Sequence, residues 1–172
     1  MNNKFLKIVK DWVLPVVIAI IVALLMKKFV LYTVYIPSES MVPTLNVDDR
    51  LIVTKVHNVD KLKRGDIIVF ESKEFNDTFI KRLIGLPGDE IKISNGEVSV
   101  NGEKIQEDYV KNNDLDYKGS FKVPDGKYFF LGDNRSNSMD SRYWSNPYIS
   151  GKYIQGKAQF KIYPFSDLGI LK

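Results

Sequence analysis

The amino-acid sequence predicts a mainly β protein: an antiparallel β-sheet domain preceded by one N-terminal transmembrane helix. Three observations carry this prediction. An apolar segment lies near the N-terminus, short runs of β-branched and aromatic residues follow it, and two Asn-Gly pairs separate some of these runs. No helical period recurs after the apolar segment. We therefore expect a short tail over 1–11, a membrane anchor over 12–28 and a β-rich domain over 29–172.

The anchor prediction rests on residues 12–26, which are uncharged and almost wholly apolar. As a helix they would span about 22 Å, against about 30 Å for the hydrocarbon core of a bilayer. The flanking lysines have long stems that reach toward headgroups and narrow this gap. A cleavable secretory signal and a buried core helix are the alternatives. The first lacks a small-x-small cleavage site directly after the run, and the second would be unusually apolar on all sides.

The β prediction rests on composition and alternation. Asn95-Gly96 and Asn101-Gly102 favour tight hairpin turns, so residues 90–106 are expected to form a three-stranded meander. Residues 106–122 are polar and predict a long loop or a small extra hairpin. Runs rich in β-branched and aromatic residues predict strands at 29–36, 51–56, 66–72, 78–85, 90–94, 97–100, 127–132 and 158–164.

Composition excludes several kinds of chemistry. The chain has no cysteine and one histidine, His57. Thiol nucleophiles, disulfides, cysteine-ligated zinc and a histidine metal cluster are therefore excluded, and we expect no metal or other cofactor. Five lysines against one aspartate in residues 1–28 account for the whole formal charge of +4. A basic excess confined to the N-terminus indicates contact with a membrane surface and not with nucleic acid.

Ser40 is a candidate nucleophile, because Pro37 and Pro43 stiffen the loop that carries it. An inert Ser/Pro turn is the alternative interpretation. A serine nucleophile needs a neighbouring base, for which His57 and Lys81 are the candidates. His57 lies in a polar strand-to-turn region, which is typical of a surface histidine.

Lys81 lies inside an otherwise apolar predicted strand. Alternation places Lys81 on one face of this strand and Arg82 on the other, each between apolar neighbours. A strand lysine usually points to solvent, but apolar neighbours on both faces make solvation of both charges difficult. Burial can lower the pKa of a lysine from about 10.4 to about 7–8, whereas an arginine cannot act as a base near neutral pH.

Residues 131–142 concentrate charge among small hydroxyl and amide residues. Asp133, Arg135, Asp140 and Arg142 lie within these twelve positions. A solvated turn with surface ion pairs is one interpretation. A hydrogen-bonded platform that orients a site is the other, and composition does not separate the two.

Behind the apolar segment, three motifs follow in the order Ser38-x-Ser40-Met41-x-Pro43-Thr44, Lys81-Arg82-x-Ile84-Gly85-x-Pro87-Gly88-Asp89 and Gly132-Asp133-Asn134-Arg135-x-x-Ser138-x-Asp140-Ser141-Arg142. In this order they resemble the motifs of bacterial type I signal peptidases. Segments 64–70 and 156–165 are also similar to that family, so the likeness spans most of the chain. Asp48-Asp49 departs from the expected Gly-Asp, which puts only a turn in doubt.

The resemblance implies the fold of the signal peptidase and self-cleaving repressor type, with a Ser/Lys dyad. Ser40 would be the nucleophile and Lys81 the general base. The Ser38 hydroxyl and the Ser40 backbone N–H would form the oxyanion hole, and Ser138 would orient Lys81. Asp140 and Arg142 would form a supporting ion pair. Arg82 and Asp133 would also support the site structurally. The residues expected from their positions to form the walls of the substrate pocket are Ile36, Met41, Leu45, Phe79 and Ile80.

The implied activity is that of a membrane-bound serine endopeptidase. It would remove signal peptides from secretory precursors after small-x-small sites, such as Ala-x-Ala, through an acyl-enzyme. Its partners would be those precursors and the lipid bilayer, without nucleic acid, and a monomer is the simplest expectation. Ser40 follows Met26 by 14 residues, so the site would lie at the membrane surface. The N-terminus would be cytoplasmic and the catalytic domain extracytoplasmic.

Two other functions compete with this one. A self-cleaving repressor would need a DNA-binding helical module, and the sequence predicts none. A membrane-anchored β domain that binds a partner without catalysis would tolerate alanine at Ser40 and Lys81. The presence of every residue expected for catalysis favours the enzyme.

Overall fold

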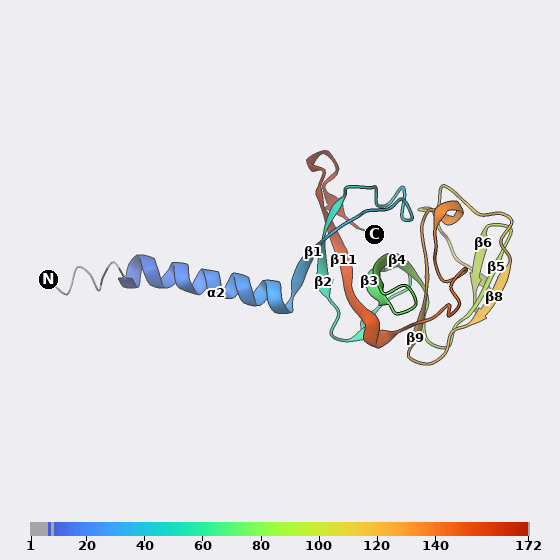
Figure 1. Ribbon diagram of the computed structural model, residues 1–172, viewed down its shortest axis with the longest axis horizontal. Coiled ribbons are helices and arrows are strands. Elements are labelled where there is room, and N and C mark those ends of the chain that lie inside the picture. Colours follow the sequence, from blue (N-terminus) through green and yellow to red (C-terminus); the bar gives the residue numbers. More distant parts are fainter. Residues whose placement is uncertain (1–6, 8, 172) are drawn as a thin grey trace. The chain divides into compact units, whose positions relative to one another are not determined.

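The computed structural model describes residue 7 and residues 9–171. The chain divides into two compact units, of which the first ends at Tyr32 and the second begins at Thr33. The N-terminal unit contains a π-helical turn, η1 (Val9–Val13), followed by helix α2 (Leu14–Phe29) (Figure 1). Most of the expected tail over 1–11, namely residues 1–6 and 8, lies outside the described residues.

Helix α2 confirms the predicted N-terminal helix but is shorter than the expected anchor. Pro15 lies in its first turn, where a missing N–H costs little. At 1.5 Å per residue, its 16 residues extend about 24 Å. No helix in the described part of the chain is both long and apolar enough to cross a membrane. We therefore correct the predicted transmembrane helix over 12–28 to a 16-residue apolar helix, because the preceding residues form the π-helical turn.

The larger of two sheets carries eight strands. β11 lies between β2 and β3 and pairs antiparallel with both, so the C-terminal part of the chain returns to the middle of the sheet. The strand order is β1-β2-β11-β3-β4-β9-β10, and β12 pairs with β11. The strands are β1 (Leu31–Tyr35), β2 (Arg50–Lys55), β3 (Ile67–Ser72), β4 (Asp77–Gly85), β9 (Lys127–Leu131), β10 (Ile149–Ser150), β11 (Ile154–Tyr163) and β12 (Gly169–Ile170).

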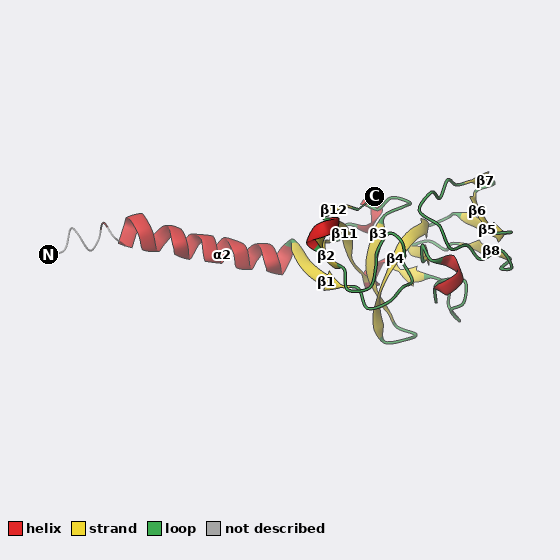
Figure 2. Ribbon diagram, turned by 90° about the horizontal axis from the view of Figure 1, so that it is seen from above, coloured by secondary structure: helices red, strands yellow, loops and turns green. Residues whose placement is uncertain are grey.

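The smaller sheet contains the predicted meander. Both Asn-Gly turns have two residues with positive φ, 52° and 76° at Asn95 and Gly96 and 54° and 86° at Asn101 and Gly102. This is the conformation for which Asn-Gly is favoured in hairpins. The order is β7-β6-β5-β8, and the sheet lies on the side of the domain away from β1 and β2 (Figures 1 and 2). Its strands are β5 (Glu90–Ser94), β6 (Glu97–Val100), β7 (Glu103–Lys104) and β8 (Gly119–Lys122).

The two faces of β4 contribute to two separate cores. Leu83 packs in a cluster with Phe70, Phe130 and Trp144. Its neighbour Ile84 packs in a second cluster beneath the smaller sheet. Period-two alternation therefore buries both faces of this strand, as its nearly continuous apolar sequence predicts. Short 3₁₀ turns complete the domain at η2 (Val59–Lys61), η3 (Arg135–Asn137), η4 (Gly151–Tyr153) and η5 (Phe165–Asp167).

The departure from the expected Gly-Asp pair falls at a left-handed position. Asp48 has a φ of 72°, a region that favours glycine but that aspartate tolerates better than most residues. Its carboxylate accepts a hydrogen bond from the Tyr35 hydroxyl. The turn is therefore kept with aspartate in place of glycine.

Candidate active site

Ser40 and Lys81 meet although they lie 41 positions apart in the sequence. Ser40 lies in the loop between β1 and β2, and Lys81 lies in the middle of β4. Lys81 Nζ donates a hydrogen bond to Ser40 Oγ, and Ser38 Oγ lies 3.4 Å from the same oxygen. The alternative base, His57, lines a different pocket together with Lys61. The structure thus brings together the predicted nucleophile and the lysine.

Burial gives Lys81 the properties of a base. Its side chain is almost completely enclosed, with 3% of the residue exposed. Desolvation lowers the pKa of Lys81 to about 8, and Arg142 acts in the same direction, while Asp140 and Asp133 oppose the shift. The Phe79 ring, 5.7 Å from Nζ, forms part of this apolar surrounding. A substantial fraction of Lys81 is therefore neutral slightly above neutral pH and able to take a proton.

The segment after β9 is hydrogen-bonded to the loop that carries Ser40. The backbone N–H of Asn134 donates to the Ser40 carbonyl oxygen at 3.1 Å, and the Asn134 amide donates to the Glu39 carbonyl oxygen at 3.1 Å. A β-carbon on Gly132 would lie 2.5 Å from the Ser40 carbonyl oxygen and closer still to the Ser138 hydroxyl. Glycine is therefore required where this segment passes Ser40.

Ser138 lies next to Gly132, but its hydroxyl does not make the predicted hydrogen bond with Lys81. Its hydroxyl is buried and has no hydrogen-bond partner among the described residues. The expected hydrogen bond to Lys81 is thus not formed in this structure. Ser138 contacts the Gly132 position beside Ser40, so its role in orienting Lys81 stays a prediction.

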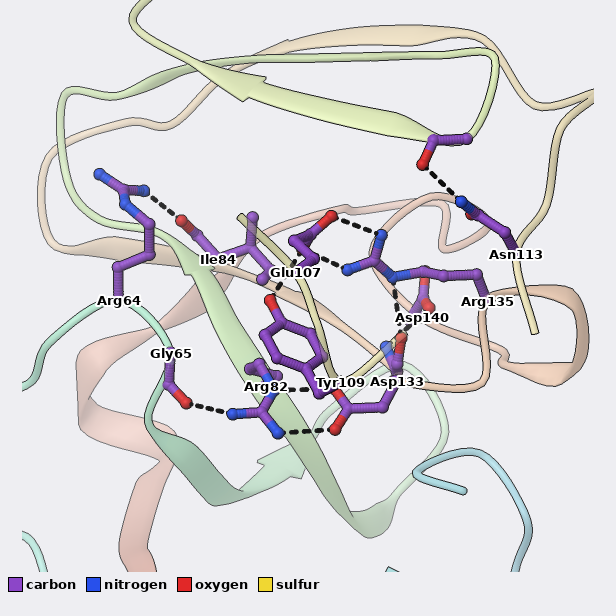
Figure 3. A network of polar contacts seen from close by, with 12 residues as sticks. Arg64, Gly65, Arg82, Ile84, Glu107, Tyr109, Asn113, Asp133, Arg135 and Asp140 are labelled. Atoms are coloured by element: carbon purple, nitrogen blue, oxygen red, sulfur yellow. Dashed lines mark hydrogen bonds and ion pairs between the residues drawn. The ribbon is translucent and has the colours of Figure 1, made fainter. Parts of the chain in front are cut away.

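Arg82 and Asp133 form a bidentate buried ion pair (Figure 3). Arg82 Nε lies 2.8 Å from Asp133 Oδ1 and Nη2 lies 2.6 Å from Oδ2. The hydroxyl of Thr44 donates to the same carboxylate at 2.5 Å. Since Thr44 belongs to the nucleophile loop, this pair links that loop to β4 and to the segment after β9.

Asp140 and Arg142 form the second predicted pair. Arg142 Nε lies 2.9 Å from Asp140 Oδ1, and Arg142 Nη2 lies 3.0 Å from Oδ2. Asp140 also accepts the Gly132 backbone N–H at 2.9 Å. Asp133, Arg135, Asp140 and Arg142 are all buried. The interpretation of residues 131–142 as a solvated turn is therefore wrong, and the hydrogen-bonded platform is present.

A cleft of about 350 Å³ opens at Ser40 and Lys81. Of the expected pocket residues, Phe79 lines it. Ile80 does not, because alternation turns it to the other face of β4 from Lys81. Ile36, Met41 and Leu45 are no more than 1% exposed and belong to the core. The remaining lining residues, which the sequence prediction missed, are Glu39, Asn137 and Met139.

The sequence prediction also missed the contribution of residues 105–118, the segment between β7 and β8. Glu107, Tyr109 and Asp114 of this segment contact the buried arginines Arg135, Arg82 and Arg142. Polar composition was the available signal, and it does not distinguish such a segment from a solvated loop. Among the described residues, no group of three or more His, Cys, Asp or Glu side chains could hold a metal ion.

The chain is similar to known proteins over most of its length. The chain is 43% identical over 162 residues to a probable signal peptidase I-2 of Synechocystis sp., covering 90% of this chain and 73% of that protein. It is 38% identical over 169 residues to a signal peptidase I of Bacillus licheniformis, covering 92% and 90%. A crystal structure of a signal peptidase I from Enterococcus faecalis V583 is similar with a TM-score of 0.51 and 32% identity, over 58% of this chain and 98% of that one.

The family model for the signal peptidases of peptidase family S26 matches residues 9–163, which is most of the chain. The match includes the Ser40 loop, β4 and the whole platform after β9. The chain therefore belongs to the signal peptidase I family and is a peptidase that acts in signal-peptide removal.

Proposed function

We propose that this chain is a membrane-attached serine endopeptidase that cuts secretory precursors with Ser40 as nucleophile and Lys81 as general base. The observation that carries the proposal is the hydrogen bond between the buried Lys81 Nζ and Ser40 Oγ at the floor of an open cleft. The lowered pKa of Lys81 supports it, since a general base works best with a pKa near the working pH.

Neutral Lys81 takes the proton of Ser40 Oγ as this oxygen attacks the carbonyl carbon of the scissile peptide. The resulting Lys81 ammonium donates that proton to the leaving nitrogen, the C–N bond breaks, and the signal peptide stays esterified to Ser40. Lys81 then takes a proton from a water molecule that attacks the ester. The ester breaks, Ser40 Oγ regains a proton, and the signal peptide leaves with a new carboxylate.

Ser38 is the proposed partner of the negative oxygen that forms during attack. Its hydroxyl lies 3.4 Å from Ser40 Oγ, close enough to reach the oxygen of a carbonyl bound at that atom. Together with the Ser40 backbone N–H it would supply two donors, the usual arrangement of an oxyanion hole. Removing one such donor typically costs about 10²–10³ in kcat.

The proposed substrate is an extended segment with small side chains at the first and third positions before the cut. In an extended chain alternate side chains point the same way, so these two face the enzyme together. Phe79 and Met139 on the walls of the 350 Å³ cleft favour small groups over large ones. Precursors with Ala-x-Ala before the cut should therefore be processed faster than variants with Leu at either alanine.

We propose further that α2 attaches the enzyme to the bilayer, with the catalytic domain on the outer side. Every side chain over residues 10–26 is exposed, including Ile18 at 52% and Leu24 at 61%. An apolar helix exposed all round is unfavourable in water and suits a lipid environment. Alkaline extraction of membranes and protease digestion of intact spheroplasts test attachment and side. Release by alkali or protection from the protease would contradict the proposal.

The direct test is cleavage of a purified precursor by the intact protein in detergent. Ser40→Ala and Lys81→Ala should both abolish cleavage, whereas the matched exposed strand variant Lys92→Ala should cut like the parent. Activity retained in Lys81→Ala would refute the base assignment and direct attention to His57. A parent that cuts no precursor across a panel would favour the non-catalytic binding domain.

A further inference from the structure

The segment between β7 and β8, residues 105–118, lies against the buried arginines beside the site (Figure 3). We call these residues the strap. Two of its carboxylates, Glu107 and Asp114, each begin a chain of polar contacts that ends at a backbone group of Gly132. Gly132 lies so close to the Ser40 carbonyl oxygen that a β-carbon at this position would be 2.5 Å from it.

The first chain starts at Glu107. Its carboxylate accepts hydrogen bonds from both terminal nitrogens of Arg135, at 3.0 Å from Nη1 to Oε2 and 2.5 Å from Nη2 to Oε1. The remaining nitrogen of Arg135, Nε, donates to the Gly132 carbonyl oxygen at 3.0 Å. Each of the three nitrogens of this guanidinium thus donates a hydrogen bond, and two of the three bonds go to Glu107. Charge-assisted, bidentate bonds of this kind are the strong ones.

The second chain starts at Asp114. Its carboxylate lies 3.0 Å from Arg142 Nη1 and also accepts the Tyr143 hydroxyl at 2.7 Å. Arg142 holds Asp140 through its other two nitrogens, and Asp140 accepts the Gly132 backbone N–H at 2.9 Å. Glu107 is therefore linked through Arg135 to the carbonyl oxygen of Gly132. Asp114 is linked through Arg142 and Asp140 to the N–H of Gly132.

Tyr109 links the strap to β4, the strand that carries Lys81. Its ring centroid lies 3.8 Å from Arg82 Cζ, and its hydroxyl donates to Glu107 at 2.8 Å. Arg82 follows Lys81 in β4 and holds Asp133 of the platform. The strap thus also covers the arginine next to the lysine of the dyad.

We infer that Glu107 is a positioning residue of the peptidase, which sets the placement of the Gly132 peptide, and through it Ser40, by orienting Arg135. The inference rests on the proposed function of Ser40 and Lys81. Neutralising Glu107 leaves the Arg135 charge buried and weakens both of its bonds to the strap, so the Gly132 carbonyl loses a fixed donor. Small displacements of reacting groups cost catalysis up to about 10²-fold, even when substrate binding is intact.

The test compares Glu107→Gln with the parent, full length and in detergent, on an Ala-x-Ala precursor. We expect kcat to fall about ten- to a hundredfold with KM within about twofold. The matched control is Asp108→Asn, because this neighbouring carboxylate accepts a hydrogen bond from Gln106 instead of an arginine. It should change neither constant by more than about twofold. In a double-mutant cycle, Arg135→Lys should add little to Glu107→Gln, because both break one chain of contacts.

The outcomes separate the inference from the proposed function. A parent that cuts and a Glu107→Gln variant that matches it in kcat would overturn the inference alone. A fall in kcat equal to the loss of folded protein in near-ultraviolet circular dichroism would also overturn it, since the role would then be structural only. If Glu107→Gln does not fold, Glu107→Asp, which keeps the charge but shortens the reach to Arg135, is compared with the parent in the same way, and an unchanged kcat would overturn the inference. A parent inactive on all precursors would remove both proposals.

Discussion

Replacing Lys81 with methionine should abolish activity and yet stabilise the protein at neutral pH. Methionine keeps the unbranched shape of the lysine stem but carries no charge. In the folded chain the pKa of Lys81 is lowered from 10.5 to about 8 because burial disfavours the ammonium form. At about 1.36 kcal/mol per pH unit, this shift corresponds to about 3 kcal/mol of destabilisation at neutral pH.

The hydrogen bond to Ser40 offsets part of the gain. Losing a typical intramolecular hydrogen bond costs about 1 kcal/mol, so Lys81→Met should be more stable than the parent by about 2 kcal/mol at pH 7. The sign depends on pH. The folded pKa lies below the unfolded one, so between about pH 8 and 10.5 the unfolded chain binds the extra proton and the parent gains stability as pH rises. Above that window only the lost bond remains, and the variant should be less stable by about 1 kcal/mol.

Urea unfolding of both proteins in the same detergent, followed by tryptophan fluorescence at pH 7, 8.5 and 10.5, measures this difference. Trp144 is buried in the core cluster and reports loss of packing. The control is Lys92→Met on β5, which replaces an exposed lysine and should change the free energy of unfolding at pH 7 by no more than about 0.5 kcal/mol. The claim that burial of the charged Lys81 destabilises the folded chain would be refuted by either of two results. One is a Lys81→Met variant no more stable than the parent at pH 7, and the other is a stability difference that does not shrink by pH 10.5.

Three further predictions follow from the site. In the parent, kcat/KM should rise with pH through about pH 8 as Lys81 loses its proton, and a flat profile from pH 6 to 10 would contradict Lys81 as the base. Gly132→Ala should lower precursor cleavage at least about 100-fold because its methyl would strike the Ser40 carbonyl oxygen, whereas Gly169→Ala, with nothing within 4 Å, should cut normally. Asp133→Asn should destabilise the domain by about 3–5 kcal/mol in urea unfolding, since it removes the carboxylate that balances the buried Arg82 charge, and a change below about 1 kcal/mol would count against the pair.

Local sequence was enough to place most strands. The runs over 51–56, 66–72, 78–85 and 127–132 all form strands within one or two residues of the predicted bounds. The two Asn-Gly turns were predictable because their positive φ values are a property of those two residues. The strands that escaped prediction, β8, β10 and β12, have two to four residues, too few to show alternation.

The order of the motifs was also enough to indicate the family, and with it the candidates Ser40 and Lys81. It did not indicate the pocket, because Ile36, Met41 and Leu45 are adjacent in sequence to the site yet point into the core. Nor did it indicate the extent of α2, where a π-helical turn replaces the start of the expected helix.

Only the tertiary structure turns these candidates into a site. The pKa of Lys81 depends on how completely β4 and the elements packed against it exclude water, which no local pattern reports. From the sequence, Glu107 and Asp114 are indistinguishable from solvated loop residues. In the folded chain they form ion pairs with Arg135 and Arg142. Strands and turns follow from neighbours in the chain, whereas burial and charge pairing follow from neighbours in space.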